Sequence, residues 1–213
     1  VLGSRFTMGF TLAGLFVFGF FASYLASSER IVSDVFGLGS WFPLIFGASS
    51  LMAGAAVLFN PRFIDRVGLR RMVRYAVIAN LLAMAGLMLV ALVTSGRPPF
   101  WLYMAAMVPI LLSHSFVMPN LNSAALLPMG RVAGTAAAVI GSISALGGAL
   151  LGALIDGAYD GTVTPFAVGG LIVTAMAYLL YRWSDAVWER DAERQVGPSS
   201  AESAAAVASS DLA

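Results

Sequence analysis

The sequence predicts an all-α membrane protein with six transmembrane helices, and three observations lead to this fold class. Charged residues make up 11% of the 213 residues, whereas a soluble domain carries roughly a quarter. Hydrophobic residues make up 59%, and the mean hydropathy is +0.86. The apolar residues also lie in long runs. Residues 6–27 carry no charge, and at about 1.5 Å per residue a helix of this length matches the thickness of a bilayer core.

Six such segments follow one another along the chain. They are residues 6–27, 41–59, 75–94, 102–126, 132–155 and 165–183. Each is expected to be a helix, because lipid offers the backbone no hydrogen-bond partner outside the segment. The fourth contains Pro109 and Pro119, which predict a kink. Residues 184–213 are expected to form a largely disordered cytoplasmic tail, because their Ala, Ser and few acids cannot bury a core. The first part of this tail has the composition of a short polar helix.

The arginines predict the orientation of the helices. An even number of spans puts both chain ends on one side of the membrane. Ten of the twelve arginines fall on that side, namely Arg5, Arg62, Arg66, Arg70, Arg71, Arg74, Arg131, Arg182, Arg190 and Arg194. Arg30 and Arg97 fall on the other side. The positive-inside rule therefore predicts that both termini are cytoplasmic.

The composition argues against several classes of function. There is no Cys, so disulfides and thiolate metal sites are excluded. The net charge of +1 gives no argument for nucleic-acid binding. The predicted spans contain no Asp or Glu, and the sequence shows no cluster of carboxylates, His or activated nucleophile of the kind an enzyme needs. We therefore expect no enzymatic activity, no cofactor and no metal.

A charged stretch, NPRFIDRVGLRR, connects the second and third predicted spans at residues 60–71. A positive-inside anchor explains its arginines but not Asp65 or Gly68. The stretch resembles the cytoplasmic signature of the major facilitator superfamily, G-x-x-x-D-R-x-G-R-R. The matching residues are Asp65, Arg66, Gly68, Arg70 and Arg71. Pro61 replaces the first Gly of the signature and Leu69 replaces the Arg after Gly68, so the copy is degenerate. The resemblance implies that these residues gate the cytoplasmic side.

A second stretch narrows the resemblance. Residues 118–165 resemble the tenth and eleventh helices of bicyclomycin/chloramphenicol-resistance (Bcr/CflA-type) drug:proton antiporters. The resemblance lies in Pro119-Asn120, in the AGTA of residues 133–136 and in the glycines that follow. It implies the C-terminal six-helix half of a twelve-helix transporter in a bacterial plasma (inner) membrane. Such a half consists of two inverted three-helix repeats, with the substrate site near the midplane.

This resemblance also implies the partners: the lipid bilayer, a small-molecule substrate, protons if transport is coupled, and an N-terminal six-helix half that this chain lacks. A coupling carboxylate is then expected in that half, because intramembrane charges are functional by default. Two alternatives stay open. One is a six-helix remnant or scaffold without transport activity, and the other is a half-transporter that works with a second copy of itself.

Four polar residues inside the spans are candidates for the substrate cavity. His114 either binds substrate or senses protons, or it is a structural residue bonded to a neighbouring carbonyl or serine. Asn80, Asn120 and Asn122 are expected to face protein or a cavity, since unpaired amides are costly in lipid. They either bond between helices or contact substrate. The aromatic residues near the outer ends of the spans are expected to be interfacial anchors; they are Tyr24, Trp41, Trp101 and Tyr103.

The fifth span carries small residues at every fourth position. These are Ala137, Gly141, Ala145, Ala149 and Ala153, with Gly148 and Gly152 on an adjacent face. In lipid, small residues allow the close backbone approach that drives helix association. The ridge therefore packs against a neighbour within the six-helix unit or against a second unit. A shorter small face, formed by Gly47, Ser50 and Gly54, lies on the second span.

Overall fold

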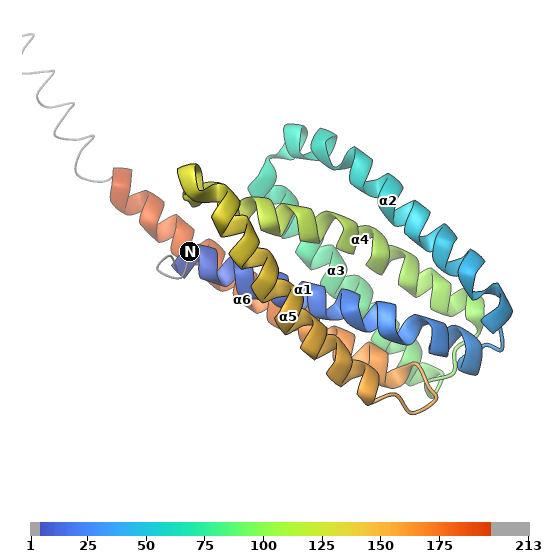
Figure 1. The fold of residues 1–213 in the computed structure, drawn as a ribbon. Coiled ribbons are helices and arrows are strands. Elements are labelled where there is room, and N and C mark those ends of the chain that lie inside the picture. Colours follow the sequence, from blue (N-terminus) through green and yellow to red (C-terminus); the bar gives the residue numbers. More distant parts are fainter. Residues whose placement is uncertain (1–4, 197–213) are drawn as a thin grey trace, which may run out of the picture.

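The computed structural model describes residues 5–196, apart from the side chains of Arg5, Arg131 and residues 188–196. The helices in this range are α1 (Arg5–Arg30), α2 (Phe42–Val67), α3 (Leu69–Val93), α4 (Phe100–Leu126), α5 (Ala133–Gly157) and α6 (Thr164–Val196). A π-helical turn, Ile31–Val35, extends α1, and two 3₁₀ turns, Gly39–Trp41 and Leu127–Val132, lead into α2 and α5. Figure 1 shows the six helices as one elongated bundle.

Within residues 5–196, six helices are long and apolar enough to cross a membrane. The predicted class, an all-α membrane protein with six spans, is confirmed. The N-terminal end of α1, the α2–α3 junction, the α4–α5 connection and the C-terminal end of α6 lie at one end of the bundle (Figure 1). We call this the termini end. The division into two inverted repeats stays a prediction.

Helix α1 lies at the centre of the bundle. It packs against α4, α5 and α6, while α3 packs against α4 and α6. Helix α2 lies at the edge, where it contacts α4 and touches α3. Two clusters of buried side chains hold the bundle. One, around Phe10, Leu121 and Tyr181, lies toward the termini end, and the other, around Phe20 and Phe166, lies toward the opposite end.

Two glycines with positive φ set the connections. Gly68 alone separates α2 from α3, at φ 82° and ψ 148°, a conformation that is open to glycine and costly for other residues. Gly96, at φ 76°, lies in the α3–α4 loop, where its carbonyl accepts the Val163 N–H at 2.9 Å. A Cβ there would come within 2.5 Å of Thr164 Oγ1. A backbone hydrogen bond thus connects the loop before α4 with the loop before α6.

The helices extend beyond two of the expected boundaries. Residues 60–71 were expected to be a connection, yet α2 continues to Val67 and α3 begins at Leu69. Asp and Arg tolerate a helix, and these charges lie on exposed positions, so Gly68 is the break in the helical backbone. Helix α6 likewise continues past residue 183 to Val196, and Ser184 and Asp185 at the start of this extension are buried. The remainder of the expected tail, residues 197–213, lies outside the described residues.

Candidate functional site

A cavity of about 240 Å³ opens between α1, α2 and α4. Its aromatic wall consists of Phe21 and Tyr24 from α1 and Phe46 from α2. Tyr24 and Phe46 stack with their ring centroids 5.8 Å apart and an interplanar angle of 16°. The sequence had indicated that Tyr24 is an interfacial anchor. Instead Tyr24 is 8% exposed and belongs to this wall. Tyr103 is also buried, whereas Trp41 and Trp101 are exposed as expected.

The polar groups of the cavity are hydroxyls. Ser49, Ser50 and Ser115 line it. The hydroxyl of Ser49 donates to the Ile45 carbonyl, and that of Ser115 donates to the Leu111 carbonyl, each at 2.8 Å. Both oxygens keep lone pairs that can accept hydrogen bonds. No charged side chain is among the described residues that line the cavity. Its chemistry therefore suits an uncharged, largely apolar molecule with an aromatic ring and a hydrogen-bond donor.

His114 lies next to this region but does not line the cavity. It is 8% exposed. Its ring stacks on Phe21 at 5.6 Å and tilts against Phe20 at 5.5 Å. The neighbouring serines do not bond it, since Ser113 and Ser115 donate to carbonyls of α4. Within the described residues the buried Nδ1 has no hydrogen-bond partner. His114 is thus held by aromatic packing, and the hydrogen bond expected of a structural histidine is absent among the described residues.

Asn80 of α3 and Asn120 of α4 bond between helices, and neither they nor Asn122 are among the residues that line the cavity. Asn80 donates to the Ile110 carbonyl at 3.2 Å and to Ser113 Oγ at 3.0 Å. Asn120 exchanges two hydrogen bonds with Asn60, at 2.9 and 3.1 Å, and so joins α4 to α2. Both Asn80 and Asn120 are almost fully buried. Asn122 is half-buried and forms no hydrogen bond within the described residues.

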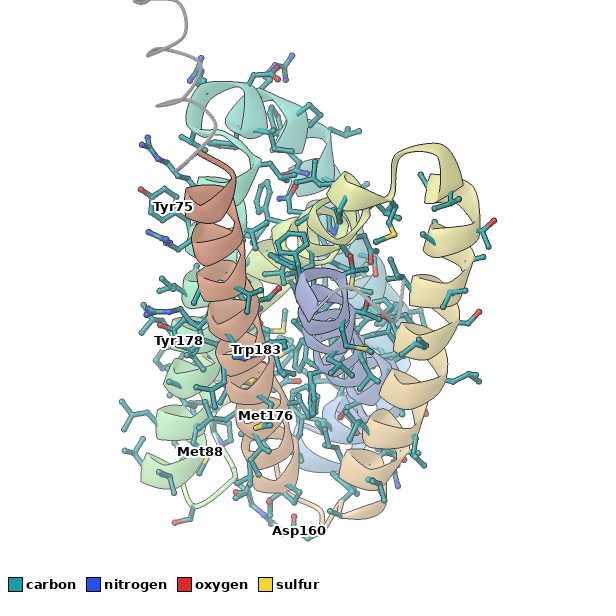
Figure 2. The ribbon with its side chains drawn as sticks, turned by 90° about the vertical axis from the view of Figure 1, so that its left-hand side faces the viewer. Tyr75, Met88, Asp160, Met176, Tyr178 and Trp183 are labelled. Atoms are coloured by element: carbon teal, nitrogen blue, oxygen red, sulfur yellow. The ribbon has the colours of Figure 1, made fainter. Side chains whose placement is uncertain are left out.

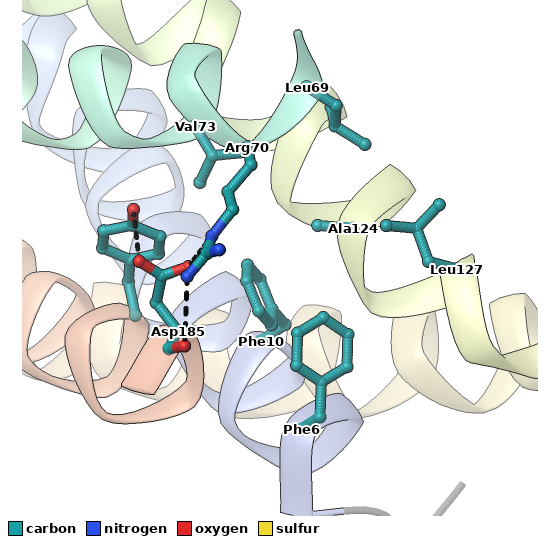
Figure 3. A pocket seen from close by; sticks show the side chains of 9 residues that line it. Phe6, Phe10, Leu69, Arg70, Val73, Ala124, Leu127 and Asp185 are labelled. Atoms are coloured by element: carbon teal, nitrogen blue, oxygen red, sulfur yellow. Dashed lines mark hydrogen bonds and ion pairs between the residues drawn. The ribbon is translucent and has the colours of Figure 1, made fainter. Parts of the chain in front are cut away.

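The predicted gating motif divides into two parts. Gly68 makes the turn, and Arg70 reaches across to α6 and binds Asp185 through Nε at 2.6 Å. Arg74 also reaches the Asp185 carboxylate, at 3.3 Å. The other three residues of the motif, Asp65, Arg66 and Arg71, are exposed and form no ion pair within the described residues. Under the Arg70–Asp185 pair lies a small cavity of about 60 Å³, lined largely by apolar residues such as Phe6 and Phe10 (Figure 3).

Sequence reasoning missed two residues of these networks. Asp185 had been assigned to the tail, and Asn60 to the connection between spans. The spacing between Tyr181 and Asp185 was a usable signal, because residues four apart lie on one helix face. The Tyr181 hydroxyl indeed donates to Asp185 Oδ2 at 3.4 Å. For Asn60 no signal in the sequence indicates the partner, because the pair joins residues 60 positions apart.

A polar cluster closes the opposite end of the bundle. Arg30 at the end of α1 forms an ion pair with Asp156 of α5, and Ser27 donates to the same carboxylate at 2.9 Å. Next to them, Tyr159 donates to Asp34 at 3.3 Å. Burial first, and then the negative charge of Asp34, raise the pKa of Tyr159 above its ordinary value. Its hydroxyl therefore remains a donor. The cluster fastens α5 to α1.

Helix α5 presents its two small faces to different surroundings. Gly148 and Gly152 are buried against α1, and a Cβ on Gly152 would come within 2.8 Å of the Ser23 backbone nitrogen. The row of Ala137, Gly141, Ala145, Ala149 and Ala153 is exposed. A Cβ on Gly141 would have no neighbour within 4 Å. Within the six-helix unit only the Gly148–Gly152 face packs closely, so we call the other row the uncovered ridge.

Comparison with known proteins adds one relative. A bicyclomycin resistance protein homolog of Haemophilus influenzae is 27% identical over 182 residues, which cover 84% of this chain and 44% of the relative. The resemblance to Bcr-type drug-resistance transporters is thereby confirmed. The chain spans less than half the length of this relative. No family model matches the chain, and no solved structure matches it. Six membrane-spanning helices and a transporter relative identify an integral membrane protein.

Among the described residues no group of three His, Asp or Glu side chains lies close enough together to hold a metal ion.

Proposed function

We propose that this chain is the C-terminal half of a drug-efflux transporter. It lies in a bacterial plasma membrane with the termini end in the cytoplasm, and it exports apolar small molecules by proton-coupled alternating access. The observation that carries the proposal is the similarity to the bicyclomycin resistance protein homolog along 84% of the chain. The arginines at the termini end support the orientation.

The surfaces of the six-helix unit support a missing half. The uncovered ridge of α5 has the small side chains that membrane helices use for close association. Helix α2 has a similar exposed face, where a Cβ on Gly47 or Gly54 would have no neighbour within 4 Å. The aromatic cavity opens on this side, since its lining residues Ser50 and Gly54 are exposed. A second six-helix unit placed against α2 would close the cavity and put the substrate between two halves.

Proton coupling is assigned to the other half. The carboxylate of Asp185 is bound by Arg70 and Arg74 toward the termini end of the bundle. No Asp or Glu lies in α4 or lines the aromatic cavity. An exchangeable proton near the substrate therefore requires a carboxylate from outside this unit, or His114.

A reconstitution experiment tests this assignment. Residues 1–213 are reconstituted in liposomes, and the internal pH is followed with a dye while hydrophobic drugs are added. The same assay is run on the product of the full open reading frame that contains this chain. We expect drug-dependent proton movement with the full product and none with the chain alone. Proton movement by the chain alone would instead support a homodimer, in which His114→Gln should abolish coupling.

Drug susceptibility distinguishes transport from a remnant or scaffold. The full product, expressed in a bacterium without its own efflux pumps, is expected to raise the inhibitory concentration of uncharged aromatic drugs. The variants Phe46→Ala and Ser50→Leu should reduce this protection, because they remove the aromatic wall or fill the cavity. Unchanged susceptibility with well-inserted wild-type protein would favour the scaffold alternative.

A further inference from the structure

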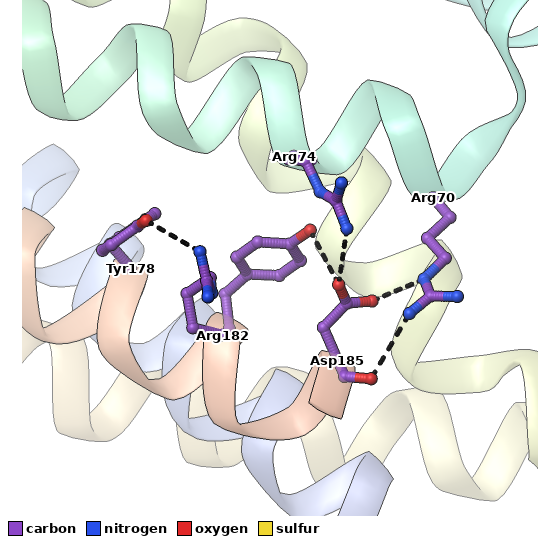
Figure 4. A network of polar contacts seen from close by, with 6 residues as sticks. Arg70, Arg74, Tyr178, Arg182 and Asp185 are labelled. Atoms are coloured by element: carbon purple, nitrogen blue, oxygen red, sulfur yellow. Dashed lines mark hydrogen bonds and ion pairs between the residues drawn. The ribbon is translucent and has the colours of Figure 1, made fainter. Parts of the chain in front are cut away.

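A polar cavity on the other side of the bundle is unrelated to the aromatic one. It has a volume of about 240 Å³ and lies between α3 and α6, where Arg74, Ile78, Arg182, Asp185 and Ala186 line it. Figure 4 shows Arg74 and Arg182 on the facing helices α3 and α6. The site borders the Arg70–Asp185 pair and shares no lining residue with the aromatic cavity.

The carboxylate in this cavity is already engaged. Asp185 Oδ1 accepts the Arg70 Nε–H at 2.6 Å. Its Oδ2 accepts from Arg74 at 3.3 Å and from the Tyr181 hydroxyl at 3.4 Å. Three donors therefore hold the single negative charge among the described lining residues.

The two arginines that line the cavity keep unused donors. Arg182 has one hydrogen bond within the described residues, to the neutral hydroxyl of Tyr178 at 3.4 Å. Arg74 uses one terminal nitrogen for Asp185. A guanidinium carries five N–H donors in a planar fork that matches the oxygens of a carboxylate or phosphate. The cavity therefore presents two cationic forks and excludes a cation.

The side chains next to the cavity favour an anion that carries an apolar group. Apolar side chains on the same two helices are exposed below it; they are Leu82, Leu89, Ile172, Met176 and Leu179. Three aromatic residues of the same two helices, Tyr75, Tyr178 and Trp183, lie along this side of the bundle (Figure 2). Tyr75 and Trp183 are 58% and 46% exposed. Aromatic side chains of this kind mark the headgroup level of a bilayer. A soluble anion could bind only in the cavity. An anionic lipid could also pack its acyl chains on the apolar surface beneath it.

We propose that Arg74 and Arg182 bind a phosphoryl anion, and that its source is the phosphate of an anionic phospholipid headgroup with its acyl chains along α3 and α6. Basic pockets between membrane helices on the cytoplasmic side are suited to such headgroups. The bound phosphate would bridge α3 and α6 and so hold the Arg70–Asp185 network in place. This site is independent of substrate transport, and a scaffold without transport activity would bind the same lipid.

The test uses the complete chain in detergent and three probes: dihexanoyl phosphatidylglycerol, dihexanoyl phosphatidylcholine and inorganic phosphate. Each is titrated while the thermal unfolding midpoint is recorded. We expect phosphatidylglycerol to raise the midpoint at concentrations at which the other two have little effect. In Arg182→Gln, about ten times more phosphatidylglycerol should be needed for the same rise in the midpoint, because a hydrogen bond to a charged group is lost. Its only described partner is a neutral hydroxyl, so the variant should fold.

Arg71→Gln is the matched control. Arg71 is exposed at the same end of the bundle and forms no hydrogen bond within the described residues. The variant loses the same charge and should keep wild-type protection. Equal weakening in both variants would show general charge attraction and would overturn the site. Equal protection by phosphatidylcholine would also overturn it. Protection by inorganic phosphate that competes with the lipid would keep the phosphoryl site and reject the lipid as its source.

Discussion

Helices α1 and α2 are each 26 residues long, and the most apolar stretches of these two spans have mean hydropathies of 1.7 and 1.9. Nevertheless, 56% of that stretch is buried in α1 and 6% in α2. In a membrane, apolar side chains suit both the protein interior and the lipid, so hydropathy does not distinguish a central helix from an edge helix. The difference between α1 and α2 lies in how closely the neighbouring helices approach each of them.

Helix α1 is surrounded because its neighbours approach closely. Gly148 and Gly152 of α5 contact its backbone, and Gly170 of α6 lies near Phe20. Helix α2 has one close polar attachment, the Asn60–Asn120 pair, and it exposes large side chains such as Leu51 and Leu58, each at 76%. We therefore expect α1 to be fixed and α2 to be the helix that moves most easily or receives a partner.

The largest effect is expected at Gly152. In Gly152→Ala the new Cβ meets the Ser23 nitrogen and the Ala22 side chain at 2.8 and 2.6 Å, so α5 must move away from α1. Overpacking of this kind costs about 1–3 kcal/mol, and contact with backbone places it near the upper end. The measurement is thermal or denaturant unfolding in detergent. Gly141→Ala is the control: it makes the same substitution in open space and should leave stability unchanged or slightly raised by helix propensity. Equal stability of the two variants would mean that α1 is not held by close approach.

The next effect is expected at the attachment of α2. Asn60→Ala leaves the Asn120 amide buried without its partner, and interhelical hydrogen bonds in membranes contribute roughly 1 kcal/mol. Amide hydrogen exchange should become faster in α2 and stay unchanged in α1. Asn122→Ala is the control, because Asn122 lies on the same helix as Asn120 and has no hydrogen bond within the described residues. If α2 exchanges at the wild-type rate in Asn60→Ala, the amide pair does not hold the helix.

These two sites also show what the sequence could and could not predict. The number of helices follows from long apolar runs, because lipid requires each run to satisfy its own backbone. The small residues of α5 predicted close packing, but not which face packs inside, since both rows consist of small residues. Pairings between distant helices, such as Asn60 with Asn120 or Arg70 with Asp185, depend on the rotation and depth of each helix. The four-residue spacing of side chains along a helix determines neither its rotation nor its depth.

A smaller effect on the unit, but a larger one on assembly, is expected at Gly141. Gly141→Leu adds a bulky side chain to the uncovered ridge, where nothing within the unit is displaced. Insertion and unfolding should match wild type, whereas association with a second six-helix unit and drug transport should fall. Co-purification of separately expressed halves, or of two differently tagged copies, measures this. Leu150→Ala serves as the control, because Leu150 is 64% exposed on the same helix outside the ridge. Unchanged association in Gly141→Leu would show that the ridge faces lipid.

The smallest effect on the unit is expected at Asp65. This residue is exposed on the last turn of α2, where a negative charge lies next to the negative end of the helix dipole and stabilises nothing locally. Removing it in Asp65→Asn should leave folding intact. An unpaired carboxylate at the edge of α2 can instead approach the N-terminal end of a helix in a partner unit, whose dipole favours an anion. Drug efflux by the full-length protein should therefore fall in Asp65→Asn, while the amount of inserted protein stays the same. Arg66→Gln changes a neighbouring exposed charge and should have little effect, because the other arginines of the stretch maintain topology. Wild-type efflux in Asp65→Asn would mean that the charged stretch serves only to set the membrane topology.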